Sequence, residues 1–239
     1  QEWTAIFLDF VIVVLGVFVG LQAQAWSQER DRRKSESAYL VRLHDEVGQL
    51  LAARARYDRT RVKFTTDIAS AIQVLNEESG SLTPDQCDAI AGSAHTTVPP
   101  AELPTVEELL TTGRLDQLTS PTVRGAILRY TQEAARARDL IMVITDSGRD
   151  IGKAYPRLMT HHFGTSRSVD DRMWLNPDCR TEAMRADPAF MNELSENAYM
   201  YNVYAFRAVL PVSARLTALH AVIDAELGVS HAQEPEAAP

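Results

Sequence analysis

Two adjacent histidines, His161 and His162, are the residues best suited by type to metal chemistry. Asp170 and Asp171 follow closely and would add oxygen ligands. Neighbouring histidines point in different directions on a helix, however, and zinc is normally held by histidines four residues apart. We therefore expect exposed histidines at a helix end, where the dipole favours them, and no metal site.

Two further motifs fall short of the chemistry they suggest. Cys179 lacks the surrounding motif and the third orienting group that a cysteine–histidine nucleophile requires. The segment Gly148 to Lys153 resembles a phosphate-binding loop, but three residues rather than four separate its glycines, and no strand precedes it. The sequence therefore predicts no catalytic residue and no cofactor, and we expect a protein that is not an enzyme.

Arg54 and Arg61 interrupt an otherwise apolar helical seam that runs from Leu40 to Leu75. They could pair with acids on a partner helix or bind an anionic ligand. Arginines at the edge of a helix bundle also extend their charged heads into water. We favour this last role for both.

Cys87 and Cys179 are the two cysteines, and each follows a Pro-Asp turn signal. Both lie outside the long helical repeats, so both fit at one end of a bundle, where they could form a disulfide. An even cysteine count beyond a membrane anchor is compatible with an oxidising periplasm. Two free cytosolic thiols are the alternative, and the bridge is the favoured interpretation.

An apolar stretch near the N-terminus would anchor the chain. Ala5 to Ala25 is the one apolar stretch of membrane length, and Phe10 to Leu21 contains no polar side chain. As a helix it would extend roughly 32 Å, close to the thickness of a hydrocarbon core. Trp3 and Trp26 bracket it, as aromatic residues do at membrane interfaces. These features predict a transmembrane helix.

Two alternatives to this span remain open. A buried helix of a soluble protein can be equally apolar, although no second stretch of this kind is present to surround it. A cleaved signal peptide is the other, because Ala23-Gln24-Ala25 has the small-x-small form of a cleavage site.

Three residues of the span suit helix packing inside a membrane. Gly16 and Gly20 form a small-xxx-small pattern that lets a second helix backbone approach closely. Asp9 lies on the same face, where a carboxylate is costly unless a partner satisfies it. Chance occurrence of the glycines and snorkelling of Asp9 to the interface are the alternatives. Together the three residues favour docking against another transmembrane helix.

The residues after the span carry a topology signal. Arg30, Arg32, Arg33 and Lys34 are basic, which by itself favours the cytoplasmic side. The rule compares both flanks of a span, and the cysteines favour the opposite side. We expect a single-pass protein of a bacterial inner membrane with the bulk of the chain in the periplasm.

Apolar residues recur at alternating three- and four-residue steps along three long segments, which predicts long packed helices. None could bury its seam alone. The predicted fold is all-α: one transmembrane helix, then an elongated antiparallel bundle of three long helices with a short-helix insert. The predicted segments are an anchor at 1–29, a first long helix at 30–80 that can continue the anchor, a short-helix insert at 81–120, two further long helices within 121–228 and a flexible tail at 229–239.

Local signals mark the helix ends. Ser120-Pro121 and Asp187-Pro188 predict the starts of the second and third long helices, each with a capping residue before a proline. Thr83-Pro84 and a capping box from Thr105 to Glu108 predict short helices in the insert. The remaining end signals are Gly80 and Gly228 as stops, and Pro156 and Pro211 as interruptions.

Composition excludes other classes. The net charge of −8 argues against a nucleic-acid surface, which needs clustered basic residues. Aromatic residues make up 7% of the chain and glycine only 11 of 239 residues, so a β-sandwich or barrel is not expected.

The N-terminal block Trp3 to Gln22, followed by Trp26 and Glu29-Arg30, resembles an uncharacterised bacterial family of single-span membrane proteins. Members share a span of the form LGVFIGLQ…NW.E.R before a helical domain, and residues 104–130 resemble their second shared block. Ser27 departs from the asparagine common there. The resemblance implies a short basic cytoplasmic stretch before the span and a periplasmic domain, and it implies no activity.

Two functions follow as expectations. The first is a non-enzymatic accessory or scaffolding subunit that docks through its span to a larger membrane assembly, for which a photosynthetic or respiratory complex is one suitable host. The second is an extracytoplasmic sensory or small-ligand-binding module. A polar pocket between helices would favour the second, and a dry core with a docking face around Gly16 and Gly20 would favour the first. Membrane lipids and other transmembrane subunits are the expected partners, and nucleic acid is not.

Overall fold

The computed structural model describes the backbone of residues 2–165 and 173–229, and the side chains of residues 14–165 and 175–229. Some predictions fall outside this described part. They concern the side chains of Trp3, Asp9, Asp170 and Asp171 and the tail at 230–239.

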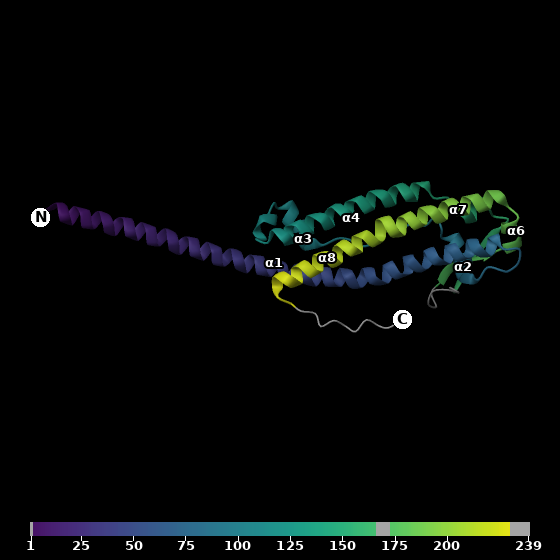
Figure 1. Ribbon diagram of the computed structural model, residues 1–239, viewed down its shortest axis with the longest axis horizontal. Helices are drawn as coiled ribbons and strands as arrows, with labels where there is room; N and C mark the ends of the chain where they lie inside the picture. The colour runs from purple at the N-terminus through teal and green to yellow at the C-terminus, as the bar shows by residue number, and fades with distance from the viewer. Residues whose placement is uncertain (1, 166–172, 230–239) are drawn as a thin grey trace. The chain divides into compact units, whose positions relative to one another are not determined.

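The described chain is mostly helical, in agreement with the predicted all-α class, and one two-stranded antiparallel sheet is the exception (Figure 1). In chain order the elements are α1 (Glu2–Asn76), α2 (Pro84–Ala91), α3 (Pro104–Thr111), the 3-10 turn η1 (Leu115–Gln117), α4 (Pro121–Ser147), α5 (Ile151–Ala154), β1 (Met159–Thr165), β2 (Met173–Cys179), α6 (Thr181–Arg185), α7 (Pro188–Val203), the π-helix η2 (Tyr204–Val209) and α8 (Leu210–Leu227).

Helix α1 is continuous over 75 residues. The basic run at 30–34 contains no proline or glycine to interrupt it, so the prediction that the apolar stretch continues into the first long helix is confirmed. The helix ends at Asn76, shortly before Gly80. Gly80 has a φ of +110°, which glycine adopts far more readily than other residues.

The predicted caps at two helix starts are confirmed. The hydroxyl of Thr83 accepts from the N–H of Gln86, and the Gln86 side chain accepts from the N–H of Thr83. This reciprocal pairing satisfies two donors at the start of α2. Asp187 caps α7 by accepting from the first N–H groups of that helix.

The second long helix is shorter than predicted, because α4 ends at Ser147 rather than near Leu158. Gly148 lies so close to the chain at Ala94 that an added Cβ would be 3.2 Å from the Ala94 Cβ. Asp150 then caps a separate turn, α5, by accepting from the N–H of Lys153 at 3.1 Å. The apolar spacing therefore continued through a real break in the helix.

The two histidines expected at a helix end lie in β1 instead, and that expectation is wrong. Pro156 follows the end of α5, as its predicted role as an interruption requires. The chain then pairs β1 with β2, placing His161 opposite Pro177 and His162 opposite Asn176.

The chain forms two compact units, each built from several segments. Unit 1 comprises residues 1–46, 103–125 and 221–239, and unit 2 comprises residues 47–102 and 126–220. Helices α1, α4 and α8 contribute residues to both.

In unit 1, acidic residues of α1 hold the segment from Leu103 to Gly125. Glu36, which is buried, accepts from the N–H and hydroxyl of Thr119 at 2.5 and 2.7 Å. Glu46 accepts from the N–H and hydroxyl of Thr105 at 3.0 and 2.7 Å. The capping box predicted at Thr105 is therefore wrong, because α3 begins two residues earlier, with Leu103 at the capping position, and Glu46 binds both Thr105 donors.

In unit 2, one end of α1 packs with α2, α5, the hairpin and α7 around an apolar cluster. The buried members of this cluster are Ala71, Leu75, Ile90, Ile151, Leu158, Met159, Met184, Phe190 and Leu194. Cys87 of α2 is bonded to Cys179 of β2, with an S–S distance of 2.00 Å, and Cys179 packs against the cluster. The disulfide thus fastens the hairpin to the core of unit 2.

Candidate functional site

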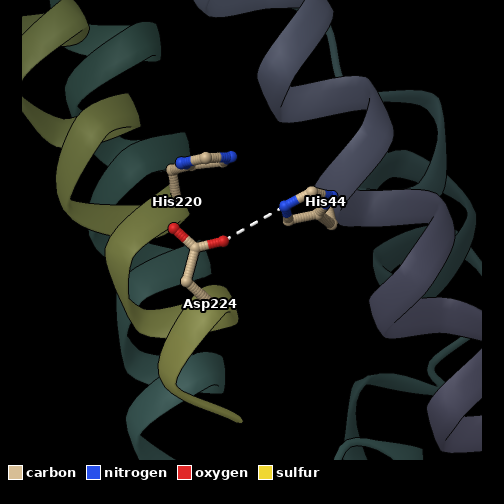
Figure 2. Close-up of side chains that lie close together, drawn as sticks. All are labelled: His44, His220 and Asp224. Carbon is tan, nitrogen blue, oxygen red and sulfur yellow. Dashed lines mark ion pairs between the residues drawn. The ribbon is translucent and has the colours of Figure 1, made fainter. Parts of the chain in front are cut away.

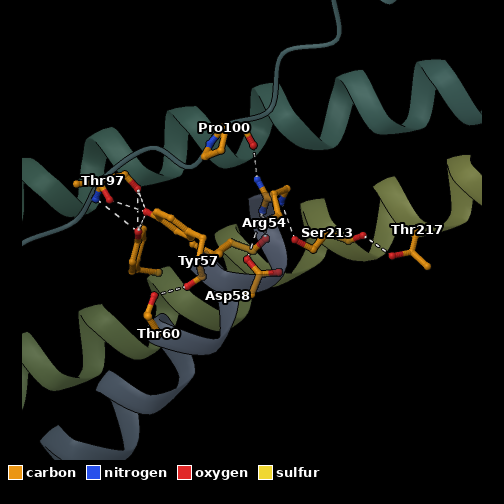
Figure 3. A network of polar contacts seen from close by, with 10 residues as sticks. Arg54, Tyr57, Asp58, Thr60, Thr97, Pro100, Ser213 and Thr217 are labelled. Atoms are coloured by element: carbon orange, nitrogen blue, oxygen red, sulfur yellow. Dashed lines mark hydrogen bonds and ion pairs between the residues drawn. The ribbon is translucent and has the colours of Figure 1, made fainter. Parts of the chain in front are cut away.

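A polar interior region of unit 2 lies beneath residues 95–102, here called the strap. The strap links α2 to α3 without helix or strand, and Pro99 and Pro100 have no N–H to donate. Its carbonyls need donors from elsewhere, since buried backbone acceptors are normally paired. Those of Thr97, Pro100 and Ala101 accept from side chains of α1 and α4 (the first two are drawn in Figure 3).

Arg54 of α1 is the central donor and is only 1% exposed. Its guanidinium donates to the Pro100 carbonyl at 2.8 Å, the Val209 carbonyl at 2.7 Å and the Ser213 hydroxyl at 2.6 Å. The carboxylate of Asp58 lies 3.9 Å away. Figure 3 shows Arg54 of α1 between Pro100 of the strap and Ser213 of α8. One side chain therefore fastens three segments of unit 2.

The expectation that Arg54 extends into water at a bundle edge is wrong. Burial lowers the pKa of Arg54 from its usual value, and Asp58 acts in the opposite direction. Arginine begins so far above neutrality that the group remains charged. It is buried because arginine offers five N–H donors in a fixed fork, which suits three acceptors at once.

The last helix is irregular beside these acceptors. Pro211 has no N–H, so the carbonyl of Arg207, four residues earlier, lacks the donor that a regular α-helix would supply. Arg136 of α4 donates to it at 2.8 Å. The preceding residues form the π-helix η2, so the predicted interruption at Pro211 is confirmed as a π-helical turn rather than a break.

A cluster of hydroxyl groups lies next to Arg54. The Tyr57 hydroxyl lies 2.5 Å from the hydroxyls of both Tyr204 and Thr97. Arg61 stacks over the Tyr57 ring at 4.5 Å and donates to the Tyr201 hydroxyl at 3.4 Å. Arg61 is therefore held against aromatic faces rather than extended into water.

Burial also determines the protonation of these hydroxyls. It raises the pKa of Tyr201 and Tyr204, and it raises the pKa of Tyr130 to about 12. All three hydroxyls are therefore neutral near pH 7, and a neutral phenol is neither a base nor an activated nucleophile. The network therefore holds the strap through hydrogen bonds from neutral hydroxyl groups.

The predicted docking residues lie on a different surface, the early part of α1 in unit 1. From Val14 to Leu21 the apolar side chains are 48–62% exposed. An added Cβ on Gly16 or Gly20 would meet no atom within 4 Å. Trp26 is 70% exposed at the end of this stretch. Within the described part of unit 1, this apolar surface has no covering element.

A histidine–carboxylate contact of unit 1 joins α1 to α8. His44 Nε2 lies 3.1 Å from Asp224 Oδ1, and both side chains are largely buried (Figure 2). His220, also drawn there, precedes Asp224 by one turn of α8. The His44–Asp224 contact could not be predicted from local sequence signals, because 180 positions separate the two residues.

His162 pairs with Asp178 across the hairpin, with Nδ1 3.0 Å from the carboxylate. Both side chains are more than half exposed, as expected for a surface pair in water. His161 instead covers Gly152, where an added Cβ would lie 2.1 Å from its ring. The two histidines therefore have separate partners.

A hollow of about 430 Å³ lies on unit 2 between the end of α4 and α7. Glu193, Glu196, Tyr199 and Ser147 are among its lining residues. Glu193 is already paired with Arg149 at 3.3 Å, which reduces the negative charge available to a ligand.

Comparison with models of protein families, with curated proteins and with solved structures found no match. The resemblance to the single-span family therefore remains an expectation, and the function is inferred from the residues themselves.

Sequence reasoning missed the role of Tyr57 and Tyr204 as donors to the strap. The available signal was the pair Pro99-Pro100, which leaves an extended segment in need of donors from other elements. Polar residues in the seam of α1, such as Arg54, were the natural candidates to supply them.

Proposed function

We propose that this protein is a membrane-anchored, non-enzymatic accessory subunit that docks through α1 to another transmembrane helix and projects a helical domain. The observation that carries the proposal is the uncovered apolar surface of α1 from Val14 to Leu21. Large exposed apolar surfaces of soluble proteins are unusual and mark contact with membranes or partners.

The free energy of transfer of these side chains favours insertion of this part of α1 into a membrane. Six side chains of this stretch are large, apolar and exposed, namely Val14, Leu15, Val17, Phe18, Val19 and Leu21. Each favours a membrane by roughly 0.3–0.6 kcal/mol, which sums to roughly 2–4 kcal/mol before residues 5–13 are counted. No charged side chain interrupts the stretch from 10 to 26.

Among the described residues, the helical stretch Pro188–Leu227 is long and apolar enough to cross a membrane. Of its most apolar 18 residues, 33% are buried. Its apolar residues are engaged in packing, since Leu194, Val212 and Leu216 are at most 1% exposed. A helix whose apolar face lies in a protein core has little left for lipid. The start of α1 is therefore the better candidate for the anchor.

Gly16 and Gly20 supply the docking surface. They are one turn apart on α1, and nothing within 4 Å would oppose a helix approaching them. The disulfide between Cys87 and Cys179 favours an oxidising compartment for the domain, which in a bacterium is the periplasm. A periplasmic domain on a docked helix suits an accessory subunit of a larger inner-membrane assembly.

The alternative is a small-ligand-binding or sensory module, and the hollow beside α7 is the observation in its favour. The polar groups beneath the strap argue for the subunit, because they bind one another rather than lining that hollow. A buried network that satisfies itself specifies a fold rather than a ligand.

The test uses the full chain in native membranes. We expect it to resist extraction by alkaline carbonate, and Gly16→Leu to reduce the recovery of co-purifying membrane proteins in mild detergent. Gly48→Leu is the matched control, since Gly48 is also on α1 with nothing within 4 Å of its Cβ position. Carbonate extraction of the wild-type chain would refute the anchor, and unchanged partner recovery with Gly16→Leu would refute docking through the glycines.

A further inference from the structure

One face of α1 carries a cationic patch directly after the apolar stretch. Trp26, Arg30, Arg33 and Lys34 are spaced at i, i+4, i+7 and i+8, which places them on one side of a helix. All four are exposed, and the Arg30 guanidinium lies 6.0 Å from the centre of the Trp26 ring. These four residues are called the headgroup face below.

The charge of this face differs from that of the chain. Residues 30–34 contain four cations and one acid, whereas the whole chain has a net charge of −8. Glu29 pairs with Arg33 at 2.9 Å, but within the described part of the chain no carboxylate pairs with Arg30 or Lys34. A local positive excess on an acidic protein indicates an anionic partner at that place.

The same side of the helix continues toward the N-terminus with apolar residues. Leu15 and Val19 precede Trp26 at helical spacing, and both are more than half exposed. One stripe therefore changes from aliphatic to aromatic to cationic. Val19 to Trp26 and Trp26 to Arg33 each rise about 10 Å, so with Trp26 at the interface the cations lie in the headgroup layer.

The hollow beside this face is open. It has a volume of about 850 Å³ and is lined by residues of α1 alone, from Trp26 to Arg42. A surface formed by one helix cannot enclose a small molecule, but a layer of headgroups can lie against it. Arginine and lysine bind phosphate oxygens through charge-assisted hydrogen bonds, and tryptophan favours the same layer.

We propose that the headgroup face binds anionic phospholipid headgroups of the leaflet that borders the helical domain. The proposal rests on the membrane anchoring proposed above, and it names one partner of that anchor. Its charges would select anionic over zwitterionic lipids in the first shell around α1.

The experiment uses the full chain with Trp3→Phe and Trp174→Phe, which leaves Trp26 as its sole tryptophan. The protein is reconstituted in phosphatidylcholine vesicles containing phosphatidylglycerol, with a dansyl label on one lipid or the other. We expect energy transfer from Trp26 to report labelled phosphatidylglycerol enriched about three- to tenfold over labelled phosphatidylcholine, with the preference weakening as salt is raised.

The decisive variant is Arg30→Gln/Arg33→Gln/Lys34→Gln, which should abolish the preference. The control replaces three exposed arginines elsewhere by glutamine, at positions 56, 59 and 129, and should keep it. Both variants change the net charge equally, so a difference between them reports the place of the charges.

The outcomes separate this inference from the anchor. Equal transfer to both lipids, with the protein floating firmly with the vesicles, overturns the headgroup face and leaves the anchor intact. A preference that survives the triple variant also overturns it. An acidic protein that co-purifies with wild type and is lost in the triple variant, without any lipid preference, assigns the face to a protein instead. Failure to float with pure phosphatidylcholine vesicles refutes the anchor itself.

Discussion

Arg54→Ala is the most informative single substitution in unit 2. The change removes the donor shared by the carbonyls of Pro100 and Val209 and the hydroxyl of Ser213, all at 2.6–2.8 Å. The alanine side chain has no donor, so these three acceptors lose the hydrogen bonds that Arg54 made to them. The main effect should be on the free energy of unfolding, because all three acceptors belong to the fold of unit 2.

The magnitude follows from the contacts. A buried acceptor that loses its partner costs about 1–3 kcal/mol, and three are affected. The substitution also leaves a cavity, but it removes the cost of burying a guanidinium, so the terms partly offset. We expect a net loss of about 3–5 kcal/mol, which for a chain of this length lowers Tm by roughly 6–20 °C. Arg54→Lys should lose less, since an ammonium keeps the charge but cannot reach all three acceptors.

The measurement is denaturant and thermal unfolding of the full chain in mild detergent, followed by circular dichroism. Arg59→Ala is the matched control, because Arg59 lies on the same helix and its side chain is exposed. This substitution should change the free energy of unfolding by less than about 0.5 kcal/mol. If Arg54→Ala and Arg59→Ala lose the same small amount, Arg54 does not fasten the strap and the reasoning fails.

Two further predictions concern titration and the disulfide. Burial raises the pKa of Tyr130 to about 12 from 10.0, so its stabilising contribution is complete below pH 10 and is lost as pH rises from 10 to about 12. Unfolding midpoints at stepped pH should fall less steeply for Tyr130→Phe than for wild type, and parallel curves would contradict this. The bond between Cys87 and Cys179 spans 92 positions, so replacing both by alanine should cost up to about 4.5 kcal/mol. A Tm unaffected by reductant, or labelling of both thiols in the native protein, would count against the bond.

Much of the helical structure could be predicted because its signals are local. The cap at Thr83 and the cap at Asp187 act within one turn of the helix they begin, so sequence is sufficient to find them. The continuity of α1 was equally local, since it required only the absence of a breaker. The arrangement of these helices as a bundle and the membrane span stay predictions.

The misplaced elements depend on contacts between distant segments. Apolar spacing continues through residues 148–158, yet the close approach of Gly148 to Ala94 and the cap at Asp150 end α4. Strand β1 has no alternating apolar pattern, and it is a strand because it pairs with β2 further along the chain. The spacing of apolar residues indicates which face of a helix would be buried. It does not indicate where contacts with other segments end the helix.

Arg54 shows the same limit at the level of one side chain. On a helical wheel it interrupts the seam, and an exposed position at the bundle edge is the simplest account. The strap and η2 reverse that account, because the carbonyls of Pro100 and Val209 and the hydroxyl of Ser213 are all placed within reach of its guanidinium. The position is polar because its neighbours are irregular, and those neighbours lie 46 and 155 positions away.

The proposed headgroup face also affects the argument about which side of the membrane carries the helical domain. Basic residues after a span ordinarily favour the cytoplasm, whereas a disulfide favours an oxidising compartment. If Arg30, Arg33 and Lys34 bind anionic headgroups, their charge has a use that does not depend on orientation. The basic flank then carries less weight as a topology signal. The bond between Cys87 and Cys179 has no comparable second explanation, since it needs oxidising conditions to persist, and it favours a periplasmic domain.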